Sequence, residues 1–107
     1  AMAAAVAQYA MPEAIAASSD EFPERRTDGC RLRVEKARAE AGRYYLIVEL
    51  AEQAGAVPAA LQLCGESGEQ ARIDLPAPRR GVIQTMVDDA SGIPALLRDP
   101  KTALYLV

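Results

Sequence analysis

The chain has 107 residues and a formal net charge of −3, a length that fits one domain. It contains no histidine and no tryptophan. The absence of histidine removes the usual general base, the commonest metal ligand and every Ser–His or Cys–His nucleophile pair. We therefore expect no catalytic residues, no metal ligands and no cofactor in this chain.

The segment 1–29 is predicted to be an N-terminal arm or linker. Its alanine-rich part, residues 2–17, favours a short helix by propensity, although Pro12 would break or kink it. Residues 18–29 are polar and read as a linker, with Phe22 as the single apolar anchor that could dock on the body. Ala1 is typical of the remnant of a cleaved tag. The arm could also bridge two copies of the chain into a homodimer.

The body, residues 30–107, changes to an alternation of apolar and polar residues with a period of two, which is typical of half-buried strands. The strongest such run is 44–50, whose inward set is predicted to be Tyr44, Leu46, Val48 and Leu50. Seven strands are predicted in all, at 30–35, 44–50, 59–64, 70–75, 81–87, 93–98 and 102–107.

Glycine- and proline-rich turns separate these short strands at regular spacing, and no long helical stripe lies among them. This pattern predicts an all-β fold, an antiparallel β-sandwich of the jelly-roll or immunoglobulin-like kind, with about seven strands.

The body carries ten acidic and ten basic residues, so it has no net charge. A nucleic-acid-binding protein normally presents a basic face, and a segment that spans a bilayer needs roughly 18 consecutive apolar residues. The sequence has neither feature, which argues against nucleic acid as a partner and against membrane insertion.

The two cysteines, Cys30 and Cys64, are too few for a disulfide framework or a four-thiolate zinc site. Two reduced thiols in a cytoplasmic protein are the simpler interpretation, and one disulfide between them is the alternative.

The candidate ligand-binding residues are two tyrosines and two arginines. Tyr45 and Tyr105 would form a stacking platform for sugar rings if they point outward, whereas the structural alternative packs them at the edge of the core. Arg79 and Arg80 could grip a carboxylate or phosphate, and the alternative is a solvated hairpin tip.

Two further motifs favour turns rather than chemistry. Asp88 and Asp89 are adjacent, so on a strand they would point to opposite faces and could not act as a facing carboxylate pair. The segment 65–68 is rich in glycine but lacks the length and the lysine of a phosphate-binding loop.

Four motifs follow one another along residues 42–107: GRYYL (42–46), GEQARIDLP (68–76), PRRG (78–81) and SGIPALLRDP (91–100). Their order resembles the β-sandwich accessory domains of large bacterial glycosyltransferases that build surface polysaccharides such as O-antigen. The order of Leu97 and Arg98 before Asp99-Pro100 departs from the family pattern, and so does the entry to the last strand. The resemblance implies a non-catalytic module of a longer protein, which has no catalytic residue of its own. Such a module would contact the glycan or the adjacent catalytic domain, or mediate assembly.

Two other functions stay open at this point. One is a stand-alone carbohydrate- or protein-binding β-sandwich, and the other is a small enzyme, for which the sequence offers no nucleophile or acid–base pair.

Overall fold

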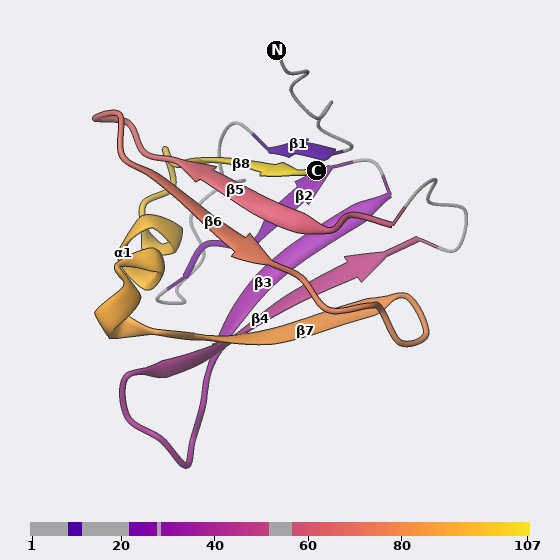
Figure 1. The fold of residues 1–107 in the computed structure, drawn as a ribbon, viewed down its shortest axis with the longest axis horizontal. Coiled ribbons are helices and arrows are strands. Elements are labelled where there is room, and N and C mark those ends of the chain that lie inside the picture. Colours follow the sequence, from indigo (N-terminus) through magenta and orange to yellow (C-terminus); the bar gives the residue numbers. More distant parts are fainter. Residues whose placement is uncertain (1–8, 12–21, 28, 52–56) are drawn as a thin grey trace.

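The computed structural model describes residues 9–11, 22–27, 29–51 and 57–107. Two four-stranded antiparallel sheets pack face to face as a β-sandwich (Figure 1). The first sheet contains, in spatial order, β1 (Tyr9–Met11), β8 (Ala103–Leu106), β5 (Ala60–Cys64) and β6 (Gln70–Asp74). The second sheet contains β2 (Arg25–Thr27), β3 (Cys30–Lys36), β4 (Arg43–Leu50) and β7 (Val82–Asp88).

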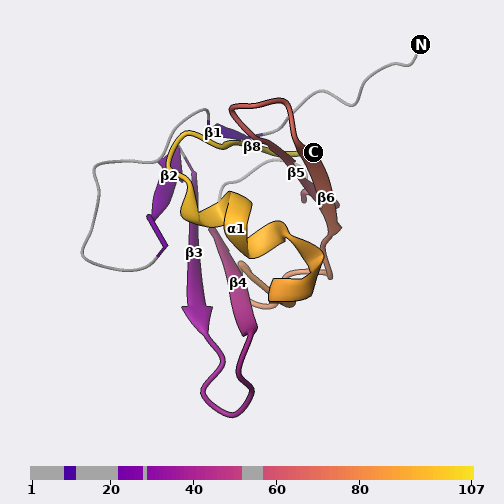
Figure 2. The ribbon, with the colours of Figure 1, turned by 90° about the vertical axis from the view of Figure 1, so that its left-hand side faces the viewer.

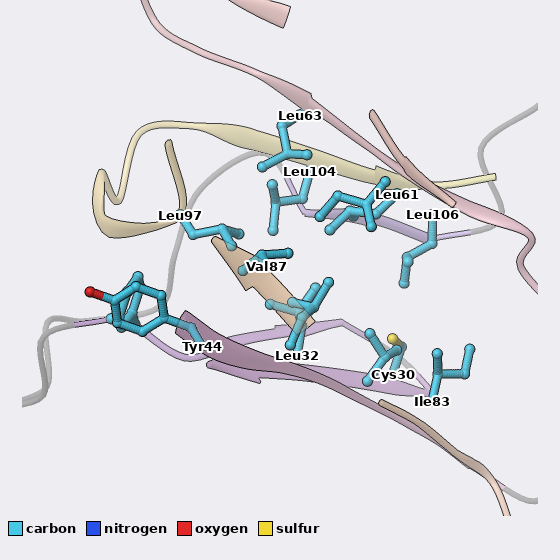
Figure 3. Close-up of a cluster of buried hydrophobic side chains, with 14 residues drawn as sticks. Cys30, Leu32, Tyr44, Leu61, Leu63, Ile83, Val87, Leu97, Leu104 and Leu106 are labelled. Atoms are coloured by element: carbon cyan, nitrogen blue, oxygen red, sulfur yellow. The ribbon is translucent and has the colours of Figure 1, made fainter. Parts of the chain in front are cut away.

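The core lies between the two sheets and is built from the inward residues of each strand. Side chains from both sheets meet there, as Figure 3 shows for Leu61 and Leu104 of the first sheet and Leu32 of the second. The predicted inward residues of β4 are confirmed. Tyr44, Leu46 and Val48 are buried, and Leu50 is partly buried and packs against the core cluster. The large apolar side chains that are fully buried in this core are Leu32, Leu46, Val48, Leu61, Leu63, Ile83, Leu97, Leu104 and Leu106.

Six of the seven predicted strands are present, and the prediction for 93–98 is wrong. This segment forms the helix α1 (Ile93–Arg98), preceded by the 3₁₀ turn η1 (Asp89–Ser91). Gly92 adopts a left-handed conformation (φ 78°) that turns the chain into the helix, and Pro94 follows in the first helical turn, where its missing N–H costs nothing. The helix closes one end of the sandwich and inserts Leu97 between the sheets (Figures 2 and 3).

The N-terminal segment contributes two strands to the sheets. Residues 9–11, which lie in the stretch where the sequence favours a helix, form β1 and pair antiparallel with β8 of the same chain. The strand β2 lies in the predicted linker and pairs with β3. Phe22 is buried against Tyr44, with ring centroids 5.0 Å apart, which confirms its docking on the body. The remaining residues of the expected helix 2–17 lie outside the described part of the chain.

Both cysteines are free thiols, so the alternative of a disulfide between them is wrong. In the part of the chain that the structure describes, no helix has the length and apolar character needed to cross a bilayer.

Candidate functional site

The structure places Tyr45 and Tyr105 on different sheets. Tyr45 lies on β4 between the inward residues Tyr44 and Leu46, and Tyr105 lies on β8 between the inward residues Leu104 and Leu106. Each tyrosine therefore faces outward from its own sheet, and the whole core separates them. Both are partly buried, and they do not form a common stacking platform.

Arg79 and Arg80 lie at the tip of the β6–β7 connection. The N–H of Arg79 donates to the Val82 carbonyl at 2.8 Å, and the Val82 N–H donates back to the Arg79 carbonyl at 3.0 Å. Positive φ angles at Arg80 (53°) and Gly81 (79°) give the two-residue turn that suits the twist of a hairpin. Both arginines are exposed, as expected for a solvated hairpin tip.

The acidic pair also has structural partners. Asp88 ends β7 and pairs with Arg43 at 2.8 Å. Asp89 begins η1 and lies 3.7 Å from Arg98, and the Tyr44 hydroxyl donates to it at 3.4 Å. The two carboxylates thus anchor the turn between β7 and α1.

The strongest candidate for a binding site is a depression of about 400 Å³ between the β5–β6 turn and α1. We call it the α1 depression. Its lining combines hydrogen-bonding side chains with a small apolar surface. The lining residues are Gly65, Glu66, Ser67, Glu69, Gln70, Ala71, Ser91, Gly92, Ala95, Leu96 and Asp99.

The β5–β6 turn forms one wall because its glycines allow a tight return. The Gly65 N–H donates to the Glu69 carbonyl at 2.7 Å, and Gly68 adopts φ +95°, a conformation that side chains disfavour. A Cβ atom at Gly65 would lie 2.6 Å from Glu69 Oε1 and 3.0 Å from Leu96 Cδ2. The glycine at this position therefore lets the Glu69 carboxylate and the helix approach the turn closely.

The opposite wall is the start of α1, which polar side chains fix in place. The Ser91 hydroxyl donates to the Asp88 carbonyl at 2.6 Å and accepts the Ile93 N–H at 3.2 Å. The Asp99 carboxylate at the far end of the helix accepts the Lys101 N–H at 2.9 Å.

Two arginines hold α1 against the sandwich. Arg25, opposite Leu32 in the β2–β3 pair, points inward and is fully buried. Its guanidinium donates to the Thr102 carbonyl and, at 2.8 Å, to the Asp99 carbonyl just after the helix. Burial lowers the pKa of Arg25 and the nearby Asp99 opposes this, but an arginine keeps its charge. That charge suits the negative C-terminal end of the helix.

Arg98, in the last turn of α1, lies over two aromatic rings. Its guanidinium carbon is 4.8 Å from the centroid of Phe22 and 5.3 Å from that of Tyr44, and it donates to the Tyr44 hydroxyl at 2.7 Å. Stacking and hydrogen bonding together fix the helix, so the depression has a rigid wall.

The charge of the α1 depression is negative. Three carboxylates, those of Glu66, Glu69 and Asp99, line it, and one ammonium group, Lys101 Nζ, lies 3.6 Å from Glu66. Together, carboxylate, hydroxyl and carboxamide groups can accept hydrogen bonds from, and donate hydrogen bonds to, a ligand that is rich in hydroxyl groups. Within the described ranges, no group of three or more His, Cys, Asp or Glu residues is placed to hold a metal ion.

No motif in the sequence points directly to this depression. It joins 65–71 to 91–99, segments that are distant in the chain and that the sequence marks only as a turn and a strand. The one available signal is Gly92-Ile93-Pro94, since proline just after a glycine fits the start of a helix better than the middle of a strand.

Comparisons of this chain with protein-family models, with curated proteins and with solved structures find no match.

Proposed function

We propose that this chain is a non-catalytic β-sandwich module that contacts a glycan through the α1 depression. The single observation that supports this best is the lining itself. Six side chains with carboxylate, hydroxyl or carboxamide groups surround a small apolar surface formed by Ala71, Ala95 and Leu96. Sugars present hydroxyl groups along their edges and C–H groups on their faces, and such a lining complements both.

The resemblance of residues 42–107 to accessory domains of bacterial surface-polysaccharide glycosyltransferases extends this proposal. Under it, the transferase chemistry belongs to another part of a longer protein, and this module holds or orients the growing polysaccharide. The lack of histidine agrees with this division of labour, because the common acid–base and nucleophile pairs need it.

Binding of the purified chain to an array of bacterial surface oligosaccharides, followed by titration calorimetry with the best ligand, tests the proposal. Ala95 is exposed on α1 and lines the depression, so Ala95→Trp fills it with little effect on the core. We expect this variant to bind about tenfold more weakly or worse. Ala77→Trp adds the same ring to an exposed alanine in the β6–β7 connection and serves as the matched control.

Two results would overturn the proposal. One is the absence of binding to every glycan tested, and the other is equal binding by the Ala95→Trp and Ala77→Trp variants. A loss of binding confined to Tyr45→Ala or Tyr105→Ala would instead favour the alternative of a sugar-stacking site on the outer face of one sheet.

A further inference from the structure

Among the described residues, the two sheets have four edge strands, and β7 differs from the other three. The strands β1 and β2 have only three residues each. The edge strand β6 has five residues, two of them the charged Arg72 and Asp74. The edge strand β7 has seven residues, Val82–Asp88, of which only the last is charged, and it contains no proline or lysine. Natural edge strands are usually short or carry charges because an unprotected edge pairs with other chains.

The register shows which backbone groups of β7 face its free edge. At the two ends of the β4–β7 ladder, the Leu50 N–H donates to the Gly81 carbonyl at 2.7 Å and the Asp89 N–H donates to the Gly42 carbonyl at 2.8 Å. Odd-numbered residues of β7 therefore direct their backbone groups toward β4, since these groups alternate along an antiparallel strand. The even-numbered residues Gln84, Met86 and Asp88 direct theirs away from the sheet.

Local hydrogen bonds limit this edge at both ends. The Val82 backbone groups are both bonded to Arg79, and the Asp88 carbonyl accepts the Ser91 hydroxyl at 2.6 Å. Between these positions, both backbone groups of Gln84 and Met86 and the N–H of Asp88 remain, and no strand among the described residues pairs with β7 on this side. Five backbone groups in a row are thus available to an added strand.

The outer face beside this edge is apolar at its centre, and Arg43 borders this apolar part, with its Nη1 donating to Met86 Sδ at 3.5 Å. Met86 is 38% exposed. Among the described residues, Val57 is the other large hydrophobic residue that is exposed. The neighbour of Met86 on β4 is Tyr45, its Cα partner in the ladder, which also faces outward. A strand added beside Met86 would cover the methionine and extend this apolar row.

We propose that this edge is a dimerisation surface, on which β7 pairs with β7 of a second copy. The two strands run antiparallel, and Met86 of one copy lies opposite Met86 of the other. The two second sheets then become one continuous sheet across a two-fold axis. This inference goes beyond the proposed glycan contact and does not depend on it.

The edge is complementary to itself in this register, which is why a second copy is the occupant. The N–H and carbonyl of each Met86 bond to those of the other, and the Asp88 N–H donates to the carbonyl of Gln84 of the second copy. The Gln84 N–H donates in turn to the Asp88 carbonyl of the second copy, whose second lone pair is free beside the bond from Ser91. On the outer face, Gln84 can donate its carboxamide N–H to the carboxylate of Asp88 of the second copy. No like charges meet, and a row of Tyr45, Met86, Met86 and Tyr45 crosses the axis.

Sedimentation-velocity ultracentrifugation over a concentration series tests the proposal with the full chain and two variants. Met86→Lys places two ammonium groups opposite each other at the two-fold axis. Gln84→Pro removes an N–H that points to the free edge, so it leaves the hydrogen bonds to β4 intact. Proline is tolerated at such a position, on the free side of an edge strand. We expect the wild-type chain to dimerise, and either change to raise the dimer dissociation constant by about tenfold or more.

Gln62→Lys is the matched control for charge, because Gln62 is exposed on β5, which is an inner strand of the first sheet. This variant should dimerise like the wild type. A monomeric wild-type chain at all concentrations would overturn the proposal. So would a dimer that both edge variants form as readily as the wild type, because it would use another surface. Far-UV circular dichroism checks that the variants keep the fold.

Discussion

Arg25 is the residue whose role is furthest from its sequence context. It lies in a polar stretch that reads as a linker, yet its side chain is fully buried and donates to two backbone carbonyls at the end of α1. The adjacent Arg26 points the other way and is exposed, paired with Glu24. The difference follows from the pleat of β2, which directs neighbouring side chains to opposite faces.

Replacement of Arg25 by alanine should therefore destabilise the protein strongly. The Asp99 and Thr102 carbonyls would lose their donor, and a cavity would replace the side chain, so we expect the free energy of unfolding to fall by about 3 kcal/mol. Urea denaturation followed by circular dichroism measures this. Arg26→Ala is the matched control and should change the stability by less than about 0.5 kcal/mol, as for an exposed ion pair. Equal effects of the two changes would contradict the assigned role of Arg25.

The two cysteines should differ in reactivity. Burial raises the pKa of the Cys30 thiol from its ordinary value of 9.0 to about 11, whereas Cys64 is partly exposed at the end of β5. Because the thiolate is the reactive form, iodoacetamide at pH 8 should label Cys64 first and Cys30 only after unfolding. Mass spectrometry of the labelled peptides shows the order, and fast labelling of Cys30 in the folded chain would contradict its burial.

The same shift predicts a pH dependence of stability. Between the unfolded pKa of Cys30 near 9 and its folded pKa of about 11, the folded state binds more protons than the unfolded state, so stability falls as the pH rises through this range. Cys30→Ala should lose less stability than the wild type between pH 9 and pH 11. Urea midpoints across this range test it, and parallel curves for the two proteins would show that the thiol has no such effect.

At the scale of the elements, the turn between β6 and β7 is nearly ideal for a hairpin. Both of its central residues, Arg80 and Gly81, have positive φ angles, as a type I′ turn requires. Arginine adopts this conformation at a cost, and the glycine suits it well, in part because a Cβ at Gly81 would lie 3.0 Å from the Leu50 carbonyl oxygen.

Asparagine at position 80 should stabilise this turn. Asn-Gly is the preferred pair for a type I′ turn, so we expect Arg80→Asn to raise the free energy of unfolding by about 0.5 to 1 kcal/mol. Thermal and urea unfolding measure the change. Arg79→Asn is the control, because Arg79 lies just before the turn and gains nothing from it, and equal effects at both positions would argue against the turn as the cause.

The helix α1 shows how local signals can mislead at this scale. Its short apolar run was compatible with a strand, and the helix has only six residues, too few for a clear period. Its formation depends on the left-handed Gly92, on Pro94 and on the burial of Leu97 between the sheets. Contacts from Arg25 and Arg98 then fix its position.

At the scale of the whole molecule, the N-terminal segment belongs to the sandwich in part. Phe22 and Arg25 are buried in the body, and β2 completes one edge of the second sheet. A chain that begins at Gly29 lacks these contacts. The end of α1 then loses the Arg25 guanidinium that donates to the Asp99 carbonyl, and Arg98 loses the Phe22 ring on which it stacks.

We therefore expect a chain that begins at Gly29 to be much less stable than the full chain, by at least as much as Arg25→Ala. Urea unfolding and near-UV circular dichroism of the truncated chain test this. A chain that begins at Phe22 is the control, since it keeps both buried side chains, and it should retain most of the stability. A truncated chain as stable as the full one would show that the segment is a dispensable arm.

The all-β class, six of the strands and their inward residues follow from the amino-acid sequence, because the two-residue period of a half-buried strand is a local property. The sequence also identified the turn at Arg79 and Arg80 and the anchor at Phe22. The grouping of the strands into two sheets came from long-range packing, and it placed Tyr45 and Tyr105 on opposite faces of the sandwich. Long-range packing alone buried Arg25, made 93–98 a helix and joined two distant segments into the α1 depression. These features arise from contacts between residues far apart in the chain, and no local pattern encodes them.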